Sequence, residues 1–400
     1  MMRHLPSWRT YRLVFFGSVV LAMVGVGFVF QHRWKAVSQS GPAVFTIHQY
    51  ITYQYNELKH PTGLLGLTYR NGQFWLYIAD SGNHVIRAHN VNSGLWTVAG
   101  SKGNAGYVNS DPWSSRFNYP TGLTGRNRWW QECDPECPFR SCCWYNDYQY
   151  IYVNDSQNFV VRKLTLGSPP VGQYEHVETA CGSGVRGMAN GPSLSAQMGS
   201  MGGIKEIGTG YYLMADAENG SLRQWDGVNV STYIGTGVPG FADGYASSAQ
   251  FDAPTQMTYD ASGNMYVADS GNNAIRKVYP SGYVHTVAGY GPEEADLVDG
   301  QGINARFSRP TSILYNAADG YTYIADSHNN VIRRMDSAGN VTTYAGTGEP
   351  GLVNGSRLSA KFSMPTDLVI HNGFMFISDS MNNVIRAINM ANGDVITYIS

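Results

Sequence analysis

The chain has few charged residues, few cysteines and no basic block, and each shortage excludes a class of protein. Charged residues make up 14% of the 400 residues, and the formal net charge is −2 at pH 7. Without clustered Lys and Arg there is no electrostatic footprint for a polyanion, which excludes a nucleic-acid partner. The five cysteines lack the paired Cys-x2-Cys spacing of a zinc knuckle, which argues against a metal site.

The signatures of common catalytic sites are missing as well. The ten histidines are scattered along the chain, and none have the His-x-x-x-His spacing that binds a metal from one helix face. No Gly-x-Ser-x-Gly sequence is present to place a nucleophilic serine on a strand-to-helix turn. The sequence therefore predicts a protein that is not an enzyme and that needs no cofactor.

The sequence has one long hydrophobic run, at residues 13–30. Eighteen helical residues extend about 27 Å, close to the hydrocarbon thickness of a bilayer. The run predicts a transmembrane signal-anchor helix after a short cytoplasmic N-terminus, residues 1–12, with the rest of the chain membrane-anchored outside the cytoplasm. The alternative is a signal peptide cleaved near residues 36–38, which would make the protein secreted.

A motif that recurs six times organises the rest of the chain. Its clearest copy is YVADSGNNAIR at residues 266–276, in which an Arg follows an Asp by seven residues. A period of about 50 to 60 residues indicates one structural unit used repeatedly. Because a catalytic pair is built once, we interpret the repeated Asp and Arg as structural anchors. The pairs are Asp80/Arg87, Asp155/Arg162, Asp216/Arg223, Asp269/Arg276, Asp326/Arg333 and Asp379/Arg386.

Each unit has the pattern of four short antiparallel strands. A β-rich run ends at the Asp, a polar Ser-x-Asn-Asn tip turns the chain, and an apolar run resumes up to the Arg. Further β-prone runs flank this hairpin on both sides. Four strands repeated radially are typical of a β-propeller blade. The sequence thus predicts an all-β, six-bladed propeller at residues 59–400, preceded by the single hydrophobic N-terminal α-helix.

The Ala-Asp-Ser-x-Asn-Asn-x-Ile-Arg core of the repeat resembles the NHL-repeat family of propellers, over roughly residues 55–400. The resemblance implies a rigid platform whose loops bind proteins, glycans or other ligands. One branch of the family is a metal-dependent lyase that needs several histidines at the central channel. No such set of histidines maps onto this sequence.

The second repeat contains an insertion at residues 125–147, which breaks the pattern. It holds Trp129, Trp130 and Trp144, which are interpreted either as a binding loop or as a small core of the insertion itself. Outside the cytoplasm its cysteines should oxidise, so disulfides are favoured over a zinc site. Sequence does not fix their pairing; the candidates are Cys133, Cys137, Cys142, Cys143 and Cys181.

The linker at residues 31–58 ends in a β-prone run at 44–55 that replaces the glycine-rich connector of the other units. Leu58 aligns with Phe251, Phe307 and Phe362, three residues before a proline in each repeat. Six contiguous blades close the ring without it, so the run is expected at a blade edge of its own chain or, alternatively, of a neighbouring subunit.

Five Asn-x-Ser/Thr sequons are candidates for glycosylation if the source modifies asparagine. They are Asn154, Asn219, Asn229, Asn340 and Asn354.

These observations favour a non-enzymatic surface propeller that binds a protein or glycan partner. One alternative is a self-assembling structural subunit of a surface layer or filament, whose copies meet through residues 13–30 and 44–55. Another is an enzyme, a hydrolase or lyase, that uses the central channel and is similar to the lyase branch or to strictosidine-synthase-like propellers. Fold alone does not decide among them.

Overall fold

The computed structural model describes residues 57–400 apart from 70–71, 134–142 and 167–173. For residues 126–133, 143–149 and 174–175 it describes the backbone alone. The predicted helix at 13–30 and the β-prone run at 44–55 lie outside the described residues. Among the residues that are described, no helix is both long enough and apolar enough to span a bilayer.

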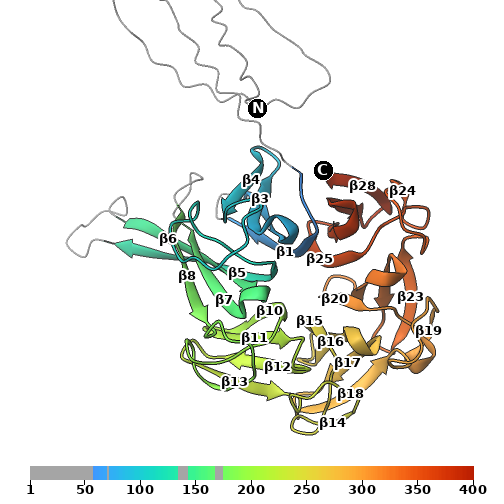
Figure 1. The fold of residues 1–400 in the computed structure, drawn as a ribbon. Coiled ribbons are helices and arrows are strands. Elements are labelled where there is room, and N and C mark those ends of the chain that lie inside the picture. The colour runs from blue at the N-terminus through green and yellow to red at the C-terminus, as the bar shows by residue number, and fades with distance from the viewer. Residues whose placement is uncertain (1–56, 70–71, 134–142, 167–173) are drawn as a thin grey trace, which may run out of the picture. The chain divides into compact units, whose positions relative to one another are not determined.

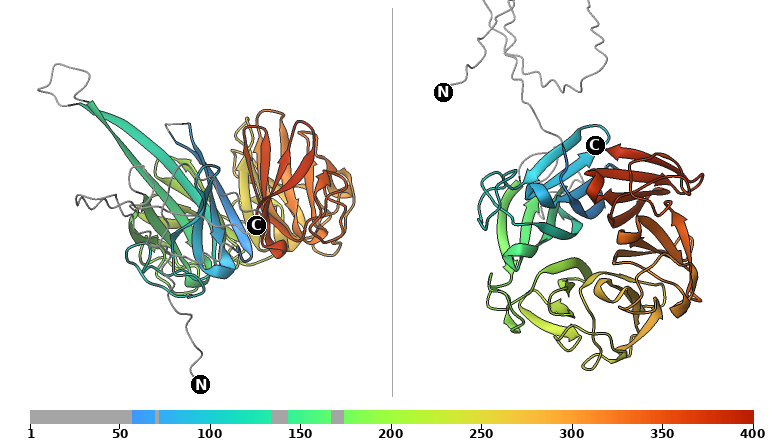
Figure 2. Two further views of the ribbon diagram at one scale, coloured as in Figure 1. Left: turned by 90° about the horizontal axis from the view of Figure 1, so that it is seen from above. Right: turned by 45° about the vertical axis from the view of Figure 1, so that its right-hand side comes forward.

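Six antiparallel sheets stand around a common axis as the blades of a ring (Figures 1 and 2). Each blade is built from strands that are contiguous in sequence, which confirms the predicted six-bladed, all-β propeller. The first two blades contain β1 (Pro61–Thr68), β2 (Phe74–Asp80), β3 (Val85–Asn90) and β4 (Gly94–Ala99), then β5 (Pro120–Cys133), β6 (Cys143–Asp155), β7 (Val160–Leu166) and β8 (Tyr174–Cys181).

Blades 3 to 6 have a fifth, two-residue strand, contributed by the connector that enters each blade and paired with that blade's outer strand. Blade 3 contains β9 (Gly191–Pro192), β10 (Met201–Gly208), β11 (Tyr211–Asp216), β12 (Ser221–Trp225) and β13 (Asn229–Ile234). Blade 4 contains β14 (Gly244–Tyr245), β15 (Pro254–Tyr259), β16 (Met265–Asp269), β17 (Ala274–Val278) and β18 (Tyr283–Ala288). Blade 5 contains β19 (Gly300–Gln301), β20 (Pro310–Asn316), β21 (Tyr321–Asp326), β22 (Val331–Met335) and β23 (Asn340–Ala345). Blade 6 contains β24 (Gly355–Ser356), β25 (Pro365–His371), β26 (Phe374–Asp379), β27 (Val384–Asn389) and β28 (Asp394–Ile399).

The polar tip between the second and third strands is a short 3-10 turn followed by one left-handed residue. In blade 4 the turn is Ser270–Asn272, and Asn273 follows with φ 51° and ψ 39°. Asn is among the residues that adopt this conformation at lowest cost, which explains its place in the motif. The same turn recurs at Ser81–Asn83, Ser156–Asn158, Ser327–Asn329 and Ser380–Asn382; a separate 3-10 turn, Gly302–Asn304, lies in the connector to blade 5.

The hydrophobic core is divided into six clusters, one at each interface between neighbouring blades. The residue three positions before the inner strand is buried at every interface. Because each blade presents an apolar face to both neighbours, the ring is stable only as a closed set. These buried residues are Leu58, Phe117, Met198, Phe251, Phe307 and Phe362.

The ring closes where blade 6 meets blade 1. Leu58 and Leu64 of the first blade pack in one cluster with Phe376 and Ile399 of the last. The Phe74 ring also stacks on His371, with centroids 3.9 Å apart. Side-chain packing thus joins the first and last blades, and no strand of one blade is exchanged into the other within the described residues.

Glycine at the start of the inner strands allows blades to approach closely. A Cβ added at Gly63 would overlap the carbonyl oxygen of Thr121 in the next blade. We expect Gly63→Ala to lower the free energy of unfolding by about 1–3 kcal/mol through this backbone clash, measured by urea denaturation. Gly208→Ala is the control, since a Cβ there meets only Tyr211 at 3.9 Å. Equal stability of the two variants would contradict the close-approach explanation.

Candidate functional site

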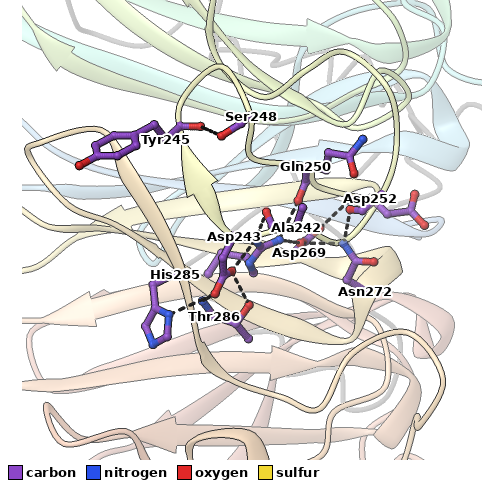
Figure 3. A network of polar contacts seen from close by, with 12 residues as sticks. Ala242, Asp243, Tyr245, Ser248, Gln250, Asp252, Asp269, Asn272, His285 and Thr286 are labelled. Atoms are coloured by element: carbon purple, nitrogen blue, oxygen red, sulfur yellow. Dashed lines mark hydrogen bonds and ion pairs between the residues drawn. The ribbon is translucent and has the colours of Figure 1, made fainter.

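The Asp and Arg of each repeat form a buried latch that ties the hairpin tip to the connector entering the same blade, and blade 4 shows it in full (Figure 3). Asp269 accepts hydrogen bonds from the backbone N–H of Asp252 at 2.8 Å and from the Nη1 of Arg276 at 2.7 Å. Asn272 Nδ2 donates to Asp269 and to the carbonyl of Gly240, both at 2.8 Å. Asp269, Asn272 and Arg276 of the motif therefore all take part in one structural contact.

The guanidinium of Arg276 also binds the connector that enters blade 4 at two separate carbonyls. Nη1 donates to the carbonyl of Gln250 at 2.8 Å, and Nη2 donates to the carbonyl of Ala242 at 2.7 Å. Nη2 donates in addition to Asp243 Oδ1 at 2.8 Å. Although burial opposes it, hydrogen bonds from Thr286 and the charge of Arg276 hold the pKa of Asp243 below its usual value.

The same latch recurs in blades 2, 3, 5 and 6. In each, the Arg donates to two connector carbonyls and to the side chain of an Asn or Asp that follows the second carbonyl. That side chain also accepts a hydrogen bond from a threonine of the outer strand, such as Thr286 Oγ1 at 2.9 Å. The four recurrences are carried by Arg162 with Asn109, Arg223 with Asn190, Arg333 with Asp299, and Arg386 with Asn354.

Burial dominates the electrostatics of these pairs. It raises the pKa of Asp269 to about 6, and the charge of Arg276 only partly offsets it. The same cause raises the pKa of Asp155 and of Asp326 to about 6. The carboxylates of these pairs are buried and bonded to protein groups, which fits a structural role for the latches.

The centre of the ring holds a polar cluster that is not repeated and that the repeat pattern did not predict. Asp367, at the start of β25, accepts hydrogen bonds from Ser312 Oγ at 2.7 Å and from the backbone N–H of Leu64 at 2.7 Å. One carboxylate thereby bridges blades 5, 6 and 1. Burial raises its pKa to about 6, because hydrogen bonds from Leu64, Ser312, Leu368 and Gln256 offset only part of the burial.

Threonines form a girdle around the same end of the inner strands. Thr366 Oγ1 donates to the carbonyl of Pro61 at 3.1 Å and so joins the last blade to the first. The equivalent bonds elsewhere in the girdle run from Thr62 to Pro120, from Thr121 to Met201, from Thr255 to Pro310 and from Thr311 to Pro365. Like Asp367, this girdle satisfies backbone groups between blades, so the centre of the ring is built to hold the blades together.

The feature that departs most from the repeat is the projecting hairpin, the antiparallel pair β5 and β6. Its ladder runs from Pro120 opposite Asp155 to Cys133 opposite Cys143. The strands have 14 and 13 residues, and they extend beyond the other blades (Figure 2). The predicted insertion is therefore an extension of two existing strands rather than a separate loop.

The ladder register assigns faces to the three tryptophans of the projecting hairpin. Trp130 lies opposite Asn146, and Glu132 lies opposite Trp144. Since residues two apart and residues directly opposite share a face, Trp130 and Trp144 belong to one face and Trp129 to the other. Their side chains lie outside the described part of the structure.

The register also gives an expected disulfide. Cys133 and Cys143 are opposite residues of an antiparallel ladder, and the Cα separation of such pairs suits a disulfide. We expect peptide mapping of oxidised, unreduced protein to recover a Cys133–Cys143 link. Recovery of Cys133 joined to Cys137 or Cys142 would contradict it. Cys137 and Cys142 lie outside the described residues.

The fifth cysteine occupies a different environment. Cys181 is a free thiol that is fully buried between blades 2 and 3. Burial raises the pKa of this thiol far above its usual value. Such a thiol is a packing group with little thiolate to react.

The sequon asparagines differ in exposure. Asn154 is fully buried and donates to the carbonyl of Gly202 at 2.8 Å, so it is not accessible in the folded protein. Asn219 belongs to the latch of blade 3 through Asp216. Asn229, Asn340 and Asn354 are exposed, although the Oδ1 of Asn354 accepts from Arg386.

Histidines are likewise dispersed in the structure. No group of three or more His, Cys, Asp or Glu residues that could hold a metal ion is found among the described residues. His84 and His328 sit at hairpin tips, where burial lowers the pKa of each.

Six radial blades, each with a buried Asp–Arg pair, make this chain a six-bladed β-propeller whose blades share one repeated sequence motif. No protein-family model matches the sequence. The chain is 26% identical over 367 residues to Protein SUPPRESSOR OF QUENCHING 1, chloroplastic, of Arabidopsis thaliana, covering 84% of this chain and 31% of that protein. It is 26% identical over 352 residues to human NHL repeat-containing protein 2, covering 79% and 45%.

The fold is also similar to that of a solved structural genomics protein from Bacteroides thetaiotaomicron, with a TM-score of 0.53, 16% identity, and 83% and 69% coverage. This last likeness concerns the fold alone. The chain spans less than half the length of the two curated relatives. The repeat, the ring and these relatives together support an NHL-repeat β-propeller family for this chain.

Proposed function

We propose that this propeller is a non-enzymatic interaction platform for a protein or glycan partner and that the projecting hairpin is its binding element. One observation carries the proposal. The first two strands of every other blade have 5 to 8 residues, whereas β5 and β6 have 14 and 13. A single projecting, tryptophan-bearing element on a symmetric ring is suited to recognition.

The contacts of the buried charged residues in the described blades support a non-enzymatic role. The six Asp–Arg pairs and Asp367 are engaged in contacts within and between blades. The extracellular location is part of the proposal and rests on the hydrophobic run at residues 13–30. Secretion after cleavage of that run is the alternative.

Photo-crosslinking tests the platform. Full-length protein carrying a photoreactive phenylalanine in place of Trp144 is irradiated in the cells that produce it, and adducts are identified by mass spectrometry. We expect discrete adducts that fall at least about tenfold when Trp130 is replaced by alanine, since aromatic anchors dominate such interfaces. Trp129→Ala, on the other face, is the matched control.

Two results would contradict the proposal. One is an adduct yield from the photoreactive group at position 144 that stays unchanged when Trp130 is replaced by alanine. The other is the same adducts from a photoreactive group at Asp319, in the corresponding turn of blade 5. Adducts between copies of the chain would instead favour the self-assembling subunit.

A further inference from the structure

Five of the six latches are filled by the same short element, which we call the connector triplet. Its first residue offers a backbone carbonyl to the Arg, and its second offers an Asn or Asp side chain. Its third pairs with the outer strand of the blade. The triplets are Val108-Asn109-Ser110, Ala189-Asn190-Gly191, Ala242-Asp243-Gly244, Val298-Asp299-Gly300 and Val353-Asn354-Gly355.

Blade 1 has the latch residues without a triplet. Arg87 is 2% exposed, yet within the described residues its guanidinium contacts only Asp80, at 3.6 Å. Thr97 takes the place of Thr286, since both lie opposite the latch Arg. The Thr97 side chain makes no hydrogen bond to the described residues. Among these residues the outer strand β4 has no fifth strand beside it, because the sheet of blade 1 is four-stranded.

The sequence does not supply a sixth triplet at the matching distance from the inner strand. Each triplet begins twelve residues before the first residue of that strand, and the same spacing before Pro61 gives Gln49, Tyr50 and Ile51. Tyr50 has no short amide or carboxylate. The third position has φ of 144°, 149° and 137° in Gly191, Gly244 and Gly355, a region that favours glycine. Ser110 and Gly300 pair with the outer strand from the same position without a positive φ.

We infer that the outer edge of blade 1, formed by β4, Thr97 and Arg87, is an acceptor for an extended segment of a partner protein with the sequence apolar–Asn/Asp–Gly. The inference rests on the proposed role as an interaction platform and names the partner's chemistry. Recognition would be strand addition, in which backbone hydrogen bonds give affinity and one side chain gives specificity. The five internal triplets show the geometry that such a segment adopts.

The physical reason is the guanidinium of Arg87, which within the described residues contacts only Asp80. Burial lowers the pKa of Arg87, and Asp80 only partly opposes this. In blade 4 the same group has four acceptors within 2.8 Å. A partner that offers a carbonyl and a carboxylate or amide oxygen restores charge-assisted hydrogen bonds to a desolvated cation, and these are stronger than bonds between neutral groups. An open strand edge adds backbone donors and acceptors.

Peptide binding to the full-length chain tests the inference. The probe is a fluorescein-labelled peptide with the sequence of residues 349–361, which contains the triplet of blade 6, and binding is followed by fluorescence anisotropy. We expect saturable binding that weakens at least about tenfold when the probe carries Asn354→Leu or Gly355→Ile, because each removes one element of recognition. These changes lie in the peptide, so protein folding is unaffected.

Hydrogen exchange locates the contact. The probe should slow exchange of amides in β4 and not in β18, the outer strand of blade 4, whose latch is filled. Thr97→Val should weaken binding, whereas the matched Thr286→Val should not. The inference is overturned if the probe and its Gly355→Ile form bind equally, or if protection falls on another blade. Amides of β4 already protected without probe would also overturn it. The crosslinks at Trp144 test the platform itself independently.

Discussion

Replacing Arg276 with alanine is expected to lower the free energy of unfolding by about 3–5 kcal/mol. The guanidinium is fully buried and donates to Asp269, to the carbonyls of Gln250 and Ala242, and to Asp243. Its removal leaves the Asp269 carboxylate buried without its cation, and it leaves two carbonyls without donors. Urea denaturation at pH 7.5, with tyrosine and tryptophan fluorescence as the probe, measures the loss.

The neighbouring residue provides the control. Lys277 follows Arg276 in β17 but is half-buried, with its ammonium over the rings of Tyr266 and Tyr279. Lys277→Ala should cost about 1 kcal/mol or less. The double variant Asp269→Ala with Arg276→Ala should cost less than the sum of the single changes, since no unpaired charge remains. Additive costs would show that the two side chains do not act as one unit.

The ring itself was predictable because its signals are local. The Asp, the Asn of the tip and the Arg lie within eight residues, and strand pairing brings them together across one hairpin, as Asp269 opposite Ala274 and Val267 opposite Arg276 show. The connector contacts were not predictable, because Ala242 and Asp243 lie more than 30 residues before Arg276. Their pairing depends on the path of the connector, which no local pattern encodes.

Asp367 was missed for a different reason. The repeated motif covers the Asp–Arg hairpin, whereas Asp367 belongs to the Pro-Thr-x start of the inner strand. The third position there is Gly63, Gly122, Gly203, Gln256, Ser312 and Asp367 in the six blades. Comparison of this column would have found one carboxylate among small and neutral residues. Its contact with Leu64 was beyond sequence reasoning, because ring closure joins residues 303 positions apart.

Replacing Asp367 with alanine is expected to lower the free energy of unfolding by about 3 kcal/mol, because Leu64 N–H, Ser312 O–H and Leu368 N–H each lose a buried acceptor. The loss falls where blades 5, 6 and 1 meet. Ser312→Ala removes a single bond and should cost about 1 kcal/mol. Urea denaturation of both variants at pH 7.5 measures the difference. Equal effects would show that the bridge to Leu64 contributes nothing to closure.

The same residue gives the ring a defined pH dependence. Burial raises the pKa of Asp367 to about 6 in the folded protein, against 3.8 for an exposed carboxyl. The folded state therefore binds this proton more tightly, so its contribution to stability is fully present below pH 3.8 and is lost as the pH rises through 6. Between pH 7.5 and pH 5 the wild type should gain about 1.4 kcal/mol relative to Asp367→Asn, which cannot titrate. A difference that stays constant, or that shrinks on acidification, would mean that the carboxylate is stabilised at the ring centre and that the hydrogen bonds from Leu64 and Ser312 outweigh its burial.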